Sequence, residues 1–375
     1  MPKGDIYIGL MSGTSMDAID TAIVQFVENT PNVLAYRELT IGEDIKAAVR
    51  RIDAATSIEE VTGCDARMGH LFADSVLQML NEANLSANEI TAIGSHGQTV
   101  LHLPDDIYPR TLQIGDPNII AYQTGITTIA DFRRMDMAAG GQGAPLAPAF
   151  HETAFRLSGT DRIILNLGGI ANITLLPSDP NDEISGFDTG PGNGLLDDWN
   201  QQQNATEMDR DSEWAATGNL NARLLESFLG DPYFNLPAPK STGRDYFNLD
   251  WLNRHLNEHG QNLEPEDIQA TLLQLTIENI AIAIEHQPLN APEIYACGGG
   301  AHNRRLMNGL KERLKNSTVT DTSALGLDPN AIEAITFAWL AKQTIEARSG
   351  NNPSVTGAHT PQILGGIYQS SNSTT

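Results

Sequence analysis

The feature that most constrains this chain is a strand–turn–strand pattern that occurs twice. IYIGLMSGTSMDAIDTAIVQF begins at Ile6, and RIILNLGGIANITLLP begins at Arg162. Each consists of an apolar run, a turn of glycine and small polar residues, and a second apolar run. The two patterns are offset by about 155 residues, close to the length of one domain. The repeat therefore predicts two α/β halves of similar layout.

Helical patterns follow each repeat, and the chain is long enough for two domains. Its 375 residues exceed the ~100–200 of a usual single domain. One segment between the halves, Asp131–His151, is rich in Gly, Ala and Pro, which is typical of a hinge or inter-domain loop. Pro329 suits the first position of the last helix. The predicted helical stretches are Glu43–Leu85, Asn219–Leu229, Pro265–Glu285, one from Asn303, and Asn330–Ala347.

Charge and composition argue against several classes of binding partner and indicate a cellular compartment. The chain has 23 Lys and Arg against 47 Asp and Glu, a net charge of -24, so nucleic acid and anionic membranes are not expected partners. Its two cysteines, Cys64 and Cys297, cannot form a disulfide framework and indicate buried thiols in a reducing compartment. The start of the chain lacks a signal-peptide pattern, and no apolar run approaches the ~20 residues of a membrane span. We expect a cytoplasmic protein.

The first turn, SGTSMDAID, has the chemistry of an oxyanion site. Gly13, Thr14 and Ser15 offer backbone N–H groups and two hydroxyls, and glycine permits positive φ and close approach of a ligand. A single such turn would be an ordinary tight turn. Two equivalent turns that face each other across a cleft could bind a polyphosphate from both sides. Asp17 and Asp20 would then need Mg²⁺ between them and the phosphates, directly or through water; otherwise they are solvated turn carboxylates, an interpretation that suits Asp20 better than Asp17. The chain has neither GxxxxGK[ST] nor GxGxxG after the first strand, so a P-loop and a Rossmann cofactor site are not expected.

Asp188, in GFDTGPGN, is the candidate general base. A carboxylate at a strand end beside a phosphate cleft could take a proton from a nucleophile. The alternative is an Asx-turn residue, and the local sequence leaves both open. Asp197 and Asp198, just beyond, are expected on an exposed helix face.

Other polar groups lie where strands or turns end, and each has a structural alternative. His96 and Thr99 in GSHGQTV follow a strand, where α/β sheets bind ligands; His96 lacks zinc-site spacing and is interpreted as a hydrogen-bonding structural histidine. Lys240 and Arg244 would contact an anion or form a local salt bridge. CGGG, from Cys297, would let an adenine ring lie on bare backbone, or is a strand-to-helix turn. Glu333 suits the first turn of the last helix.

The motifs, in order, resemble the signature set of the anhydro-N-acetylmuramic acid kinase family, within the sugar kinase, Hsp70 and actin superfamily. The resemblance runs from about Ile8 to Tyr368. Two departures are small: Ala238 stands between Pro237 and Pro239, and Asp245 stands where Glu is frequent. The matching motifs are IGLMSGTSMDAID, GSHGQTV, QIGDPNIIA, ADFRRMDMAAGGQGAPLAPAFH, NLGGIANIT, GFDTGPGN, KSTGRDYF and CGGGAHNRRLM.

The resemblance implies both a fold and a reaction. The fold is α/β, with two duplicated RNase H-like domains and an inter-domain cleft; the first domain spans 1–135 plus 348–375 and the second 136–347. The reaction uses ATP and Mg²⁺ to open the anhydro bridge of 1,6-anhydro-N-acetylmuramic acid with water and to phosphorylate O6, in bacterial cell-wall recycling in the cytoplasm, by a homodimer. The alternatives are another carbohydrate kinase on this fold and a non-enzymatic ATP switch similar to actin or Hsp70.

The resemblance also assigns residues. Asp188 would be the base that activates water, and Asp17 would bind the metal, directly or through water. The residues of the sugar pocket would be Thr99, Arg133 and Glu333. The ATP-binding residues would be Ser12, Gly13, Thr14, Ser15, Met16, Asp17, Ala18, Ile19, Asp20, Gly168, Gly169, Asn172, Gly298, Gly299 and Gly300.

Overall fold

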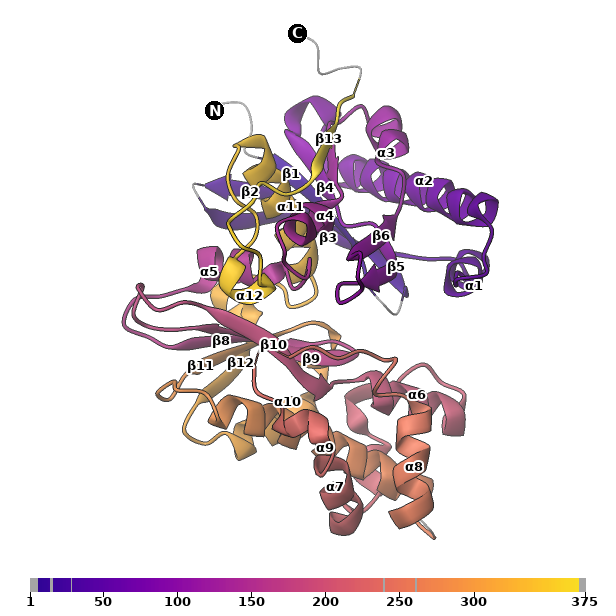
Figure 1. The fold of residues 1–375 in the computed structure, drawn as a ribbon, viewed down its shortest axis with the longest axis vertical. Coiled ribbons are helices and arrows are strands. Elements are labelled where there is room, and N and C mark those ends of the chain that lie inside the picture. The colour runs from indigo at the N-terminus through magenta and orange to yellow at the C-terminus, as the bar shows by residue number, and fades with distance from the viewer. Residues whose placement is uncertain (1–5, 14–15, 28, 239, 260–261, 371–375) are drawn as a thin grey trace. The chain divides into compact units, whose positions relative to one another are not determined.

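The computed structural model describes residues 6–13, 16–27, 29–238, 240–259 and 262–370, and it divides the chain into two compact units (Figure 1). Unit 1 comprises Met1–Ala154 and Ala331–Thr375, and unit 2 comprises Phe155–Asn330. The last helix and strand, drawn in yellow, belong with the indigo and purple elements of unit 1 (Figure 1). Two distant stretches of chain therefore build unit 1, whereas unit 2 is continuous.

The sheet of unit 1 has the strand order β13-β7-β4-β1-β2-β3. β1, β2 and β3 form an antiparallel meander, while β4 and β7 continue the sheet in parallel from β1. The C-terminal strand β13 pairs antiparallel with β7. The strands are β1 (Ile6–Ser12), β2 (Ala18–Val27), β3 (Thr30–Thr40), β4 (Ala92–Ser95), β7 (Thr128–Ala130) and β13 (Gly366–Tyr368); a separate hairpin consists of β5 (Gln98–Leu103) and β6 (Arg110–Ile114).

The sheet of unit 2 repeats this layout. Its order is β10-β9-β8-β11-β12, with an antiparallel meander β8, β9, β10 and parallel strands β11 and β12 beside β8. The strands are β8 (Arg162–Leu167), β9 (Ile170–Leu176), β10 (Ser185–Pro191), β11 (Glu293–Cys297) and β12 (Thr318–Asp321). Apart from β13, which has no counterpart in this sheet, the order and directions of the strands are the same in both units. They confirm the predicted duplicated α/β fold, which is RNase H-like in each unit.

Helix α2 (Ile58–Ala83) covers one face of the first sheet. A capping box fixes its start, because Ser57 accepts from the Glu60 N–H while the Glu60 side chain accepts from the Ser57 N–H. Its apolar side chains share a buried cluster with the inward-facing residues of β1 and β2. The other helices of this part are α1 (Glu43–Arg50), η1 (Ala87–Glu89), α3 (Pro117–Thr124), α4 (Phe132–Ala138), α5 (Ala147–Phe155) and α12 (Pro353–Thr356).

Helix α11 (Ile332–Ile345) packs against β1, β2 and β4. Gly9 alternates with the residues that face α2, so it lies on the opposite face of the sheet. A Cβ on Gly9 would lie 1.7 Å from the Ala334 carbonyl oxygen, and one on Gly94 would lie 2.0 Å from that of Phe337. The two glycines therefore let α11 approach the strands closely. The expectation that Pro329 opens this helix is wrong: Ala331 is the N-cap, and Pro329 lies in the preceding turn.

Unit 2 buries its sheet against α9 (Pro265–Glu285) and α10 (Arg304–Arg313), whose apolar residues share one cluster with β8, β9 and β11. A second buried cluster joins α6 (Gly194–Asn204), α7 (Ala222–Leu229), α8 (Leu249–His259) and the start of α9. The short 3-10 helices are η2 (Arg210–Ser212), η3 (Ala215–Thr217), η4 (Pro232–Asn235), η5 (Gly299–His302) and η6 (Thr322–Leu325).

Only the middle of the Gly- and Pro-rich segment Asp131–His151, residues 139–146, is the loop that its composition predicts. The segment also contains α4 and the start of α5, and both belong to unit 1 apart from the last residue of α5. The carboxylate of Asp136, in α4, is buried and accepts from the Gly143 N–H at 2.7 Å, from Asn351 Nδ2 at 2.6 Å and from Thr356 Oγ1 at 2.7 Å. These bonds join the segment to the C-terminal stretch of the same unit.

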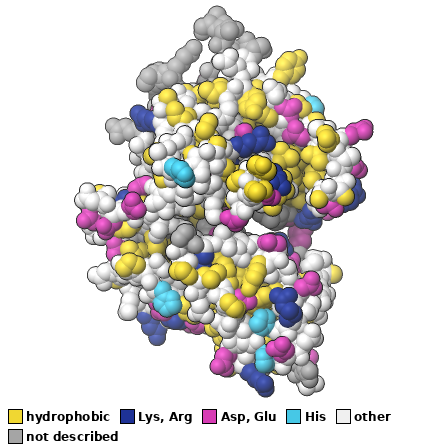
Figure 2. Space-filling view, viewed as in Figure 1, with side chains coloured by type: hydrophobic (Ala, Val, Ile, Leu, Met, Phe, Trp, Pro, Cys, Tyr) yellow, Lys and Arg dark blue, Asp and Glu magenta, His cyan; other side chains and the backbone are white. Residues whose placement is uncertain are grey.

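The exposed acidic side chains and the two cysteines are placed as the composition predicts. On the face in Figure 2, acidic side chains are scattered over the surface and interspersed with basic ones. Cys64 and Cys297 are both buried and free, as expected. Among the described residues, no helix combines the length and the apolar character that crossing a bilayer requires.

Candidate active site

The glycine turn of unit 1 joins β1 to β2. Thr14 and Ser15 lie outside the described residues. The Met16 N–H donates to the Gly13 carbonyl at 3.1 Å, and it is Met16, with φ 57°, that adopts the left-handed conformation. An added Cβ on Gly13 would meet no described atom within 4 Å. Gly13 is thus open to a ligand, but it is not the residue whose φ requires glycine.

The neighbouring predicted ATP residues divide into buried and accessible ones. Met16 and Ile19 are buried in the core of unit 1, so only their backbone is available to a ligand. Ala18 is half-buried at the start of β2. Ser12 is buried and its hydroxyl donates to Gln98 Oε1 at 2.7 Å, which ties the end of β1 to β5.

Asp17 and Asp20 differ in their exposure to solvent. Asp17 is the solvated carboxylate: its side chain is 68% exposed, with Lys46 Nζ at 3.9 Å. Asp20 lies on β2, where burial raises its pKa to about 7. The hydrogen bond from Tyr36 opposes this shift in the pKa of Asp20, while the charges of Glu333 and Glu38 add to it. The interpretation of Asp20 as a turn carboxylate in solvent is therefore wrong.

Tyr36 is the main polar partner of Asp20. Its hydroxyl lies 2.6 Å from Asp20 Oδ1 and 3.0 Å from Glu38 Oε1. Tyr36 and Glu38 lie on β3, and the β2–β3 register pairs Asp20 with Glu38 directly. The strand pairing thus brings two acids and one hydroxyl to the same edge of the turn.

Arg133 is the centre of a polar cluster in unit 1. Its Nε and Nη2 lie 3.2 and 2.8 Å from His96 Nε2, and its Nη1 donates to the Gly143 carbonyl at 2.8 Å. Burial lowers the pKa of Arg133 to about 10, and the charges of Glu333 and Asp136 oppose that change. Burial also raises the pKa of Glu333, and Arg133 moderates it. The charges of Arg133 and Glu333, two of the three predicted sugar-pocket residues, therefore act on each other within unit 1.

Thr99, the third, lies on β5, three residues beyond His96. Its hydroxyl accepts from Gln113 Nε2 at 3.2 Å across the β5–β6 hairpin. The hairpin thus fixes Thr99 independently of the Arg133 cluster.

The glycine turn of unit 2, Gly168 and Gly169, lies against the start of α6. The Asn193 N–H donates to the Gly168 carbonyl at 2.8 Å, and the Gly192 and Gly194 N–H groups donate to the Gly169 carbonyl at 3.0 Å each. A Cβ on Gly192 would lie 2.3 Å from the Gly168 oxygen. The turn is therefore held in one position by backbone contacts that only glycine permits at that point.

The predicted adenosine turn lies beside this glycine turn. Gly298 has φ 78°, and a Cβ on Gly300 would lie 2.7 Å from the Leu167 side chain and 2.8 Å from Asn193 Nδ2. An added Cβ on Gly299 would meet no described atom within 4 Å. The bare backbone at Gly299 is thus accessible, at the end of the sheet where Gly168 and Gly169 also lie.

Asp188 lies on β10 opposite Asn172 of β9, at a β-bulge between Asp188 and Gly190. Its Oδ2 accepts from Ser241 Oγ and from the Thr242 N–H, at 3.0 Å each. Burial raises the pKa of Asp188, and the bonds from Thr242 and Ser241 oppose the change. A bulge turns a side chain out of the regular ladder. Asp188 is therefore a fixed strand carboxylate rather than the Asx-turn residue that was the alternative.

The KSTGR loop holds Asp188 and makes local contacts of its own. The Asp188 N–H donates to the Lys240 carbonyl at 3.1 Å, and Lys240 Nζ donates to the carbonyls of Tyr233 and Phe234 at 3.2 and 3.3 Å. Arg244 pairs with Asp198. The local salt bridge is thus the interpretation that holds for Arg244, and the expectation of an exposed Asp198 is wrong because it is partly buried in that pair.

The described residues offer carboxylates to a divalent cation but no complete set of protein ligands. Within the described ranges, no group of three or more His, Cys, Asp or Glu side chains could hold a metal ion. Mg²⁺ usually keeps several waters and takes one or two protein carboxylates together with substrate phosphates. The exposed Asp17 carboxylate beside the first turn fits that requirement.

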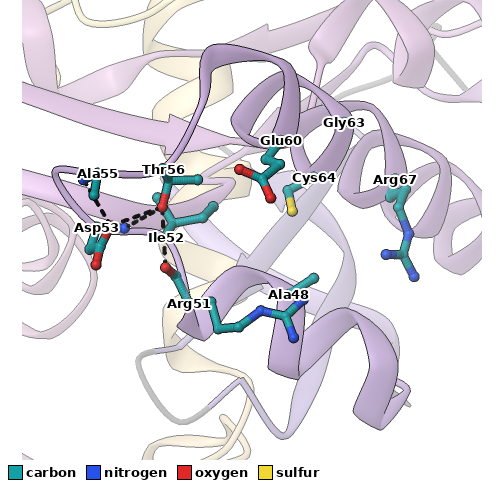
Figure 3. A pocket seen from close by; sticks show the side chains of 10 residues that line it. All are labelled: Ala48, Arg51, Ile52, Asp53, Ala55, Thr56, Glu60, Gly63, Cys64 and Arg67. Carbon is teal, nitrogen blue, oxygen red and sulfur yellow. Dashed lines mark hydrogen bonds between the residues drawn. The ribbon is translucent and has the colours of Figure 1, made fainter.

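A cavity of about 470 Å³ lies apart from these groups, between α1, the segment after it and α2 (Figure 3). Of its charged groups, Arg67 pairs with Asp44, and Glu60 bonds to the Ser57 cap. None of the described residues that line it is a predicted site residue. They are Ala48, Arg51, Ile52, Asp53, Ala55, Thr56, Glu60, Gly63, Cys64 and Arg67.

Two RNase H-like units with glycine turns at equivalent hairpins define the class of the sugar kinases, Hsp70 chaperones and actin. A family model described as Anhydro-N-acetylmuramic acid kinase matches residues 5–370. The chain belongs to the anhydro-N-acetylmuramic acid kinase family.

Curated relatives agree with this assignment. Anhydro-N-acetylmuramic acid kinase of Coxiella burnetii is 50% identical over 370 residues, covering 98% of each chain. The enzyme of the same name from Photobacterium profundum is 49% identical over 374 residues, covering 97% of this chain and 99% of the relative. Among solved structures, the activator of the 2-hydroxyisocaproyl-CoA dehydratase from Clostridium difficile with bound ADPNP has a TM-score of 0.45 at 13% identity, covering 91% of this chain and 97% of that one.

Sequence reasoning missed three contacts of these sites. Ser241 and Thr242 hold Asp188; both lie in the KSTGR motif, whose prediction above rests on the cations Lys240 and Arg244. Tyr36 carried no motif; only the pairing of β2 with β3 places it beside Asp20. His96 was identified as a hydrogen-bonding histidine, and its partner, Arg133, lies 37 residues away.

Proposed function

We propose that this protein uses ATP and water to convert 1,6-anhydro-N-acetylmuramic acid into N-acetylmuramic acid 6-phosphate and ADP. The family model matches nearly the whole chain, and membership of the family supports this reaction. The observation that carries the chemical proposal is the position of Asp188, a partly buried carboxylate fixed through one oxygen by Ser241 and Thr242.

Asp188 acts as the general base. It takes a proton from a water molecule, whose oxygen then bonds to the anomeric carbon of the sugar. Burial raises the pKa of Asp188, which brings its basicity closer to the working pH and makes proton transfer more effective. The Thr242 N–H and the Ser241 hydroxyl keep the carboxylate in one orientation and favour its charged form.

The second half of the reaction is phosphoryl transfer. As water bonds to the anomeric carbon, the bond from that carbon to the bridge oxygen breaks. The oxygen remains on C6 and attacks the γ-phosphorus of ATP, and ADP leaves. Such transfer depends mainly on positioning and on charge stabilisation, so few further catalytic groups are needed.

The two glycine turns bind ATP in this proposal. The loop from Ser12 to Asp20 contacts phosphates, and Gly168, Gly169, Asn172 and Gly298–Gly300 contact the rest of the nucleotide. The open space at Gly13 and Gly299 supports these roles. Asp17 would hold Mg²⁺, directly or through water, and the bound ion would neutralise phosphate charge.

Thr99, Arg133 and Glu333 bind the amino sugar. Arg133 stays charged at neutral pH, because its lowered pKa is still about 10. A partly buried guanidinium beside the Glu333 carboxylate offers a charged donor and an acceptor to the polar groups of a sugar. We further propose that the enzyme works as a homodimer in the cytoplasm and takes part in cell-wall recycling.

A product assay tests the proposal. The protein is incubated with ATP, Mg²⁺ and either the anhydro sugar or plain hexoses, and the products are identified by mass spectrometry. We expect N-acetylmuramic acid 6-phosphate from the anhydro sugar. Phosphorylation of hexoses with no product from the anhydro sugar would instead indicate another carbohydrate kinase. Light scattering with ATP tests the switch alternative, which requires filaments or assemblies that form without turnover.

A further inference from the structure

The guanidinium of Arg133 is held by two anchors that leave part of it free. Nε and Nη2 both donate to His96 Nε2, and Nη1 donates to the Gly143 carbonyl. A guanidinium has five N–H groups, so these contacts leave one on each terminal nitrogen. His96 Nε2 on one side and the Gly143 carbonyl on the other fix the plane of the guanidinium. They thereby fix the directions of its two remaining N–H groups.

His96 can serve as this acceptor only when Nε2 carries no proton. The residue is buried, and burial together with the Arg133 charge holds the pKa of His96 well below its usual range. The neutral tautomer with its proton on Nδ1 therefore persists over the physiological pH range. The ring packs against Phe337 of α11, with centroids 4.8 Å apart, so its orientation is fixed as well.

The second anchor is fixed by a chain of hydrogen bonds. Asp136 accepts from the Gly143 N–H through Oδ2, and from Asn351 and Thr356 through Oδ1. The Gly143 carbonyl that receives Arg133 is thus tied to α4 and to the C-terminal segment. Without His96, the Gly143 carbonyl would be the one hydrogen-bond partner left to the guanidinium among the described residues, and the guanidinium could rotate about that contact.

We propose that His96 is a positioning residue, whose Nε2 fixes the Arg133 guanidinium in the orientation that binds the amino sugar. The inference rests on the proposed function, because it takes Arg133 as a sugar-binding group. It gives His96 a function in substrate recognition in place of a purely structural one. His96 itself need not touch the substrate.

The test compares His96→Phe, His96→Gln and Arg133→Lys. Phe keeps the ring contact with Phe337 but has no acceptor, while the Gln amide oxygen can still accept from Arg133. Because hydrogen bonds to charged groups are the stronger ones, we expect His96→Phe to raise KM for the amino sugar by about tenfold or more. KM for ATP should stay unchanged, and His96→Gln should recover much of the loss. His151→Phe, at a second buried histidine of unit 1, is the control, and we expect it to leave KM unchanged whatever it does to Tm.

A double-mutant cycle separates this account from a structural one. If His96 acts through Arg133, His96→Phe should add little to KM in the Arg133→Lys background. An equal factor in both backgrounds, no rise in KM for a folded His96→Phe, or the same rise in His96→Gln as in His96→Phe would overturn the inference and leave the proposed function intact. An unchanged KM in Arg133→Lys itself would remove Arg133 from the sugar pocket, and with it the inference.

Discussion

Asp188 and Asp20 are carboxylates whose pKa burial raises, but their hydrogen bonds suit them to different tasks. Asp188 is held by Ser241 and Thr242 through one oxygen, as a base in a fixed orientation requires. Asp20 shares the Tyr36 hydroxyl with Glu38, so its charge depends on two neighbouring acids and one donor. Asp188 is therefore suited to proton transfer, whereas the charge of Asp20 changes near neutral pH.

Asp188→Asn should abolish most turnover without affecting the fold. The Asn oxygen can still accept from Ser241 and Thr242, but the amide cannot take a proton. We expect kcat to fall by at least ~10²-fold, the low end for loss of a general base, with Tm and ATP affinity near wild type. Asp245→Asn, an exposed acid of the neighbouring loop, should leave kcat unchanged. A near-wild-type kcat in Asp188→Asn would remove the residue from this role.

Asp20 should make stability depend on pH. Its folded pKa of about 7 exceeds the ordinary 3.8, so the folded state binds the proton more tightly than the unfolded chain. This contribution is therefore full below the unfolded pKa and is lost as pH rises through about 7. Asp20→Asn should flatten the fall in the free energy of unfolding between pH 4 and 7, measured by urea titration. An unchanged slope would show that Asp20 titrates normally.

Tyr36→Phe should raise the pKa of Asp20 further, because it removes the bond that lowers it. Carboxyl ¹³C NMR can follow the midpoint, with Tyr108→Phe at an exposed tyrosine as control.

At the scale of elements, the close packing of α11 on the sheet of unit 1 depends on two glycines. Gly9→Ala would place a Cβ 1.7 Å from the Ala334 carbonyl oxygen, so the helix must shift. We expect a loss of about 2 kcal/mol or more, since overpacked sites typically lose 1–3 kcal/mol and this contact is severe. Gly63→Ala, in α2, meets no described atom within 4 Å and should instead stabilise the protein by about 0.5–1 kcal/mol. Urea unfolding of both variants measures these changes, and equal signs would contradict the account.

The sequence predicted elements well where the pattern is local. The apolar period over Pro265–Glu285 predicted a helix that is α9 with the same bounds, and both glycine hairpins form as expected. What it could not predict depends on pairing between distant residues. Tyr36 reaches Asp20 only through the β2–β3 register, and Glu333 approaches Arg133 only because α11 returns to unit 1. Composition was only a partial guide to the segment after Asp131: residues 139–146 form a loop, but α4 and the start of α5 flank it, and Asp136 bonds that loop at Gly143.

For the molecule as a whole, we expect unit 2 to fold by itself, whereas the N-terminal stretch of unit 1 should not. Unit 2 is continuous from Phe155 to Asn330 and contains its own buried clusters. A fragment of residues 1–154 lacks α11, which covers the face of the sheet at Gly9 and Gly94. We expect fragment 155–330 to unfold cooperatively in urea and fragment 1–154 to show no cooperative transition, both followed by circular dichroism. Cooperative unfolding of 1–154 alone would contradict this division of the core.

The boundaries predicted at residues 135 and 347, and the expectation that the two glycine turns face one another, stay predictions. Spin labels on the two turns, measured with and without ATP and sugar, would give the distance between them in solution.

The most direct test of the central claim, that one active site joins hydrolysis to phosphorylation, is the reaction in ¹⁸O-labelled water. The reaction is quenched early, and the product is analysed by mass spectrometry with fragmentation. Authentic N-acetylmuramic acid 6-phosphate kept in labelled water without enzyme measures spontaneous exchange at the anomeric carbon. We expect one ¹⁸O in the anomeric hydroxyl, none in the phosphate ester, and formation of labelled product at least ~10²-fold slower with Asp188→Asn. Label in the ester, or anomeric label no greater than spontaneous exchange, would contradict the central claim.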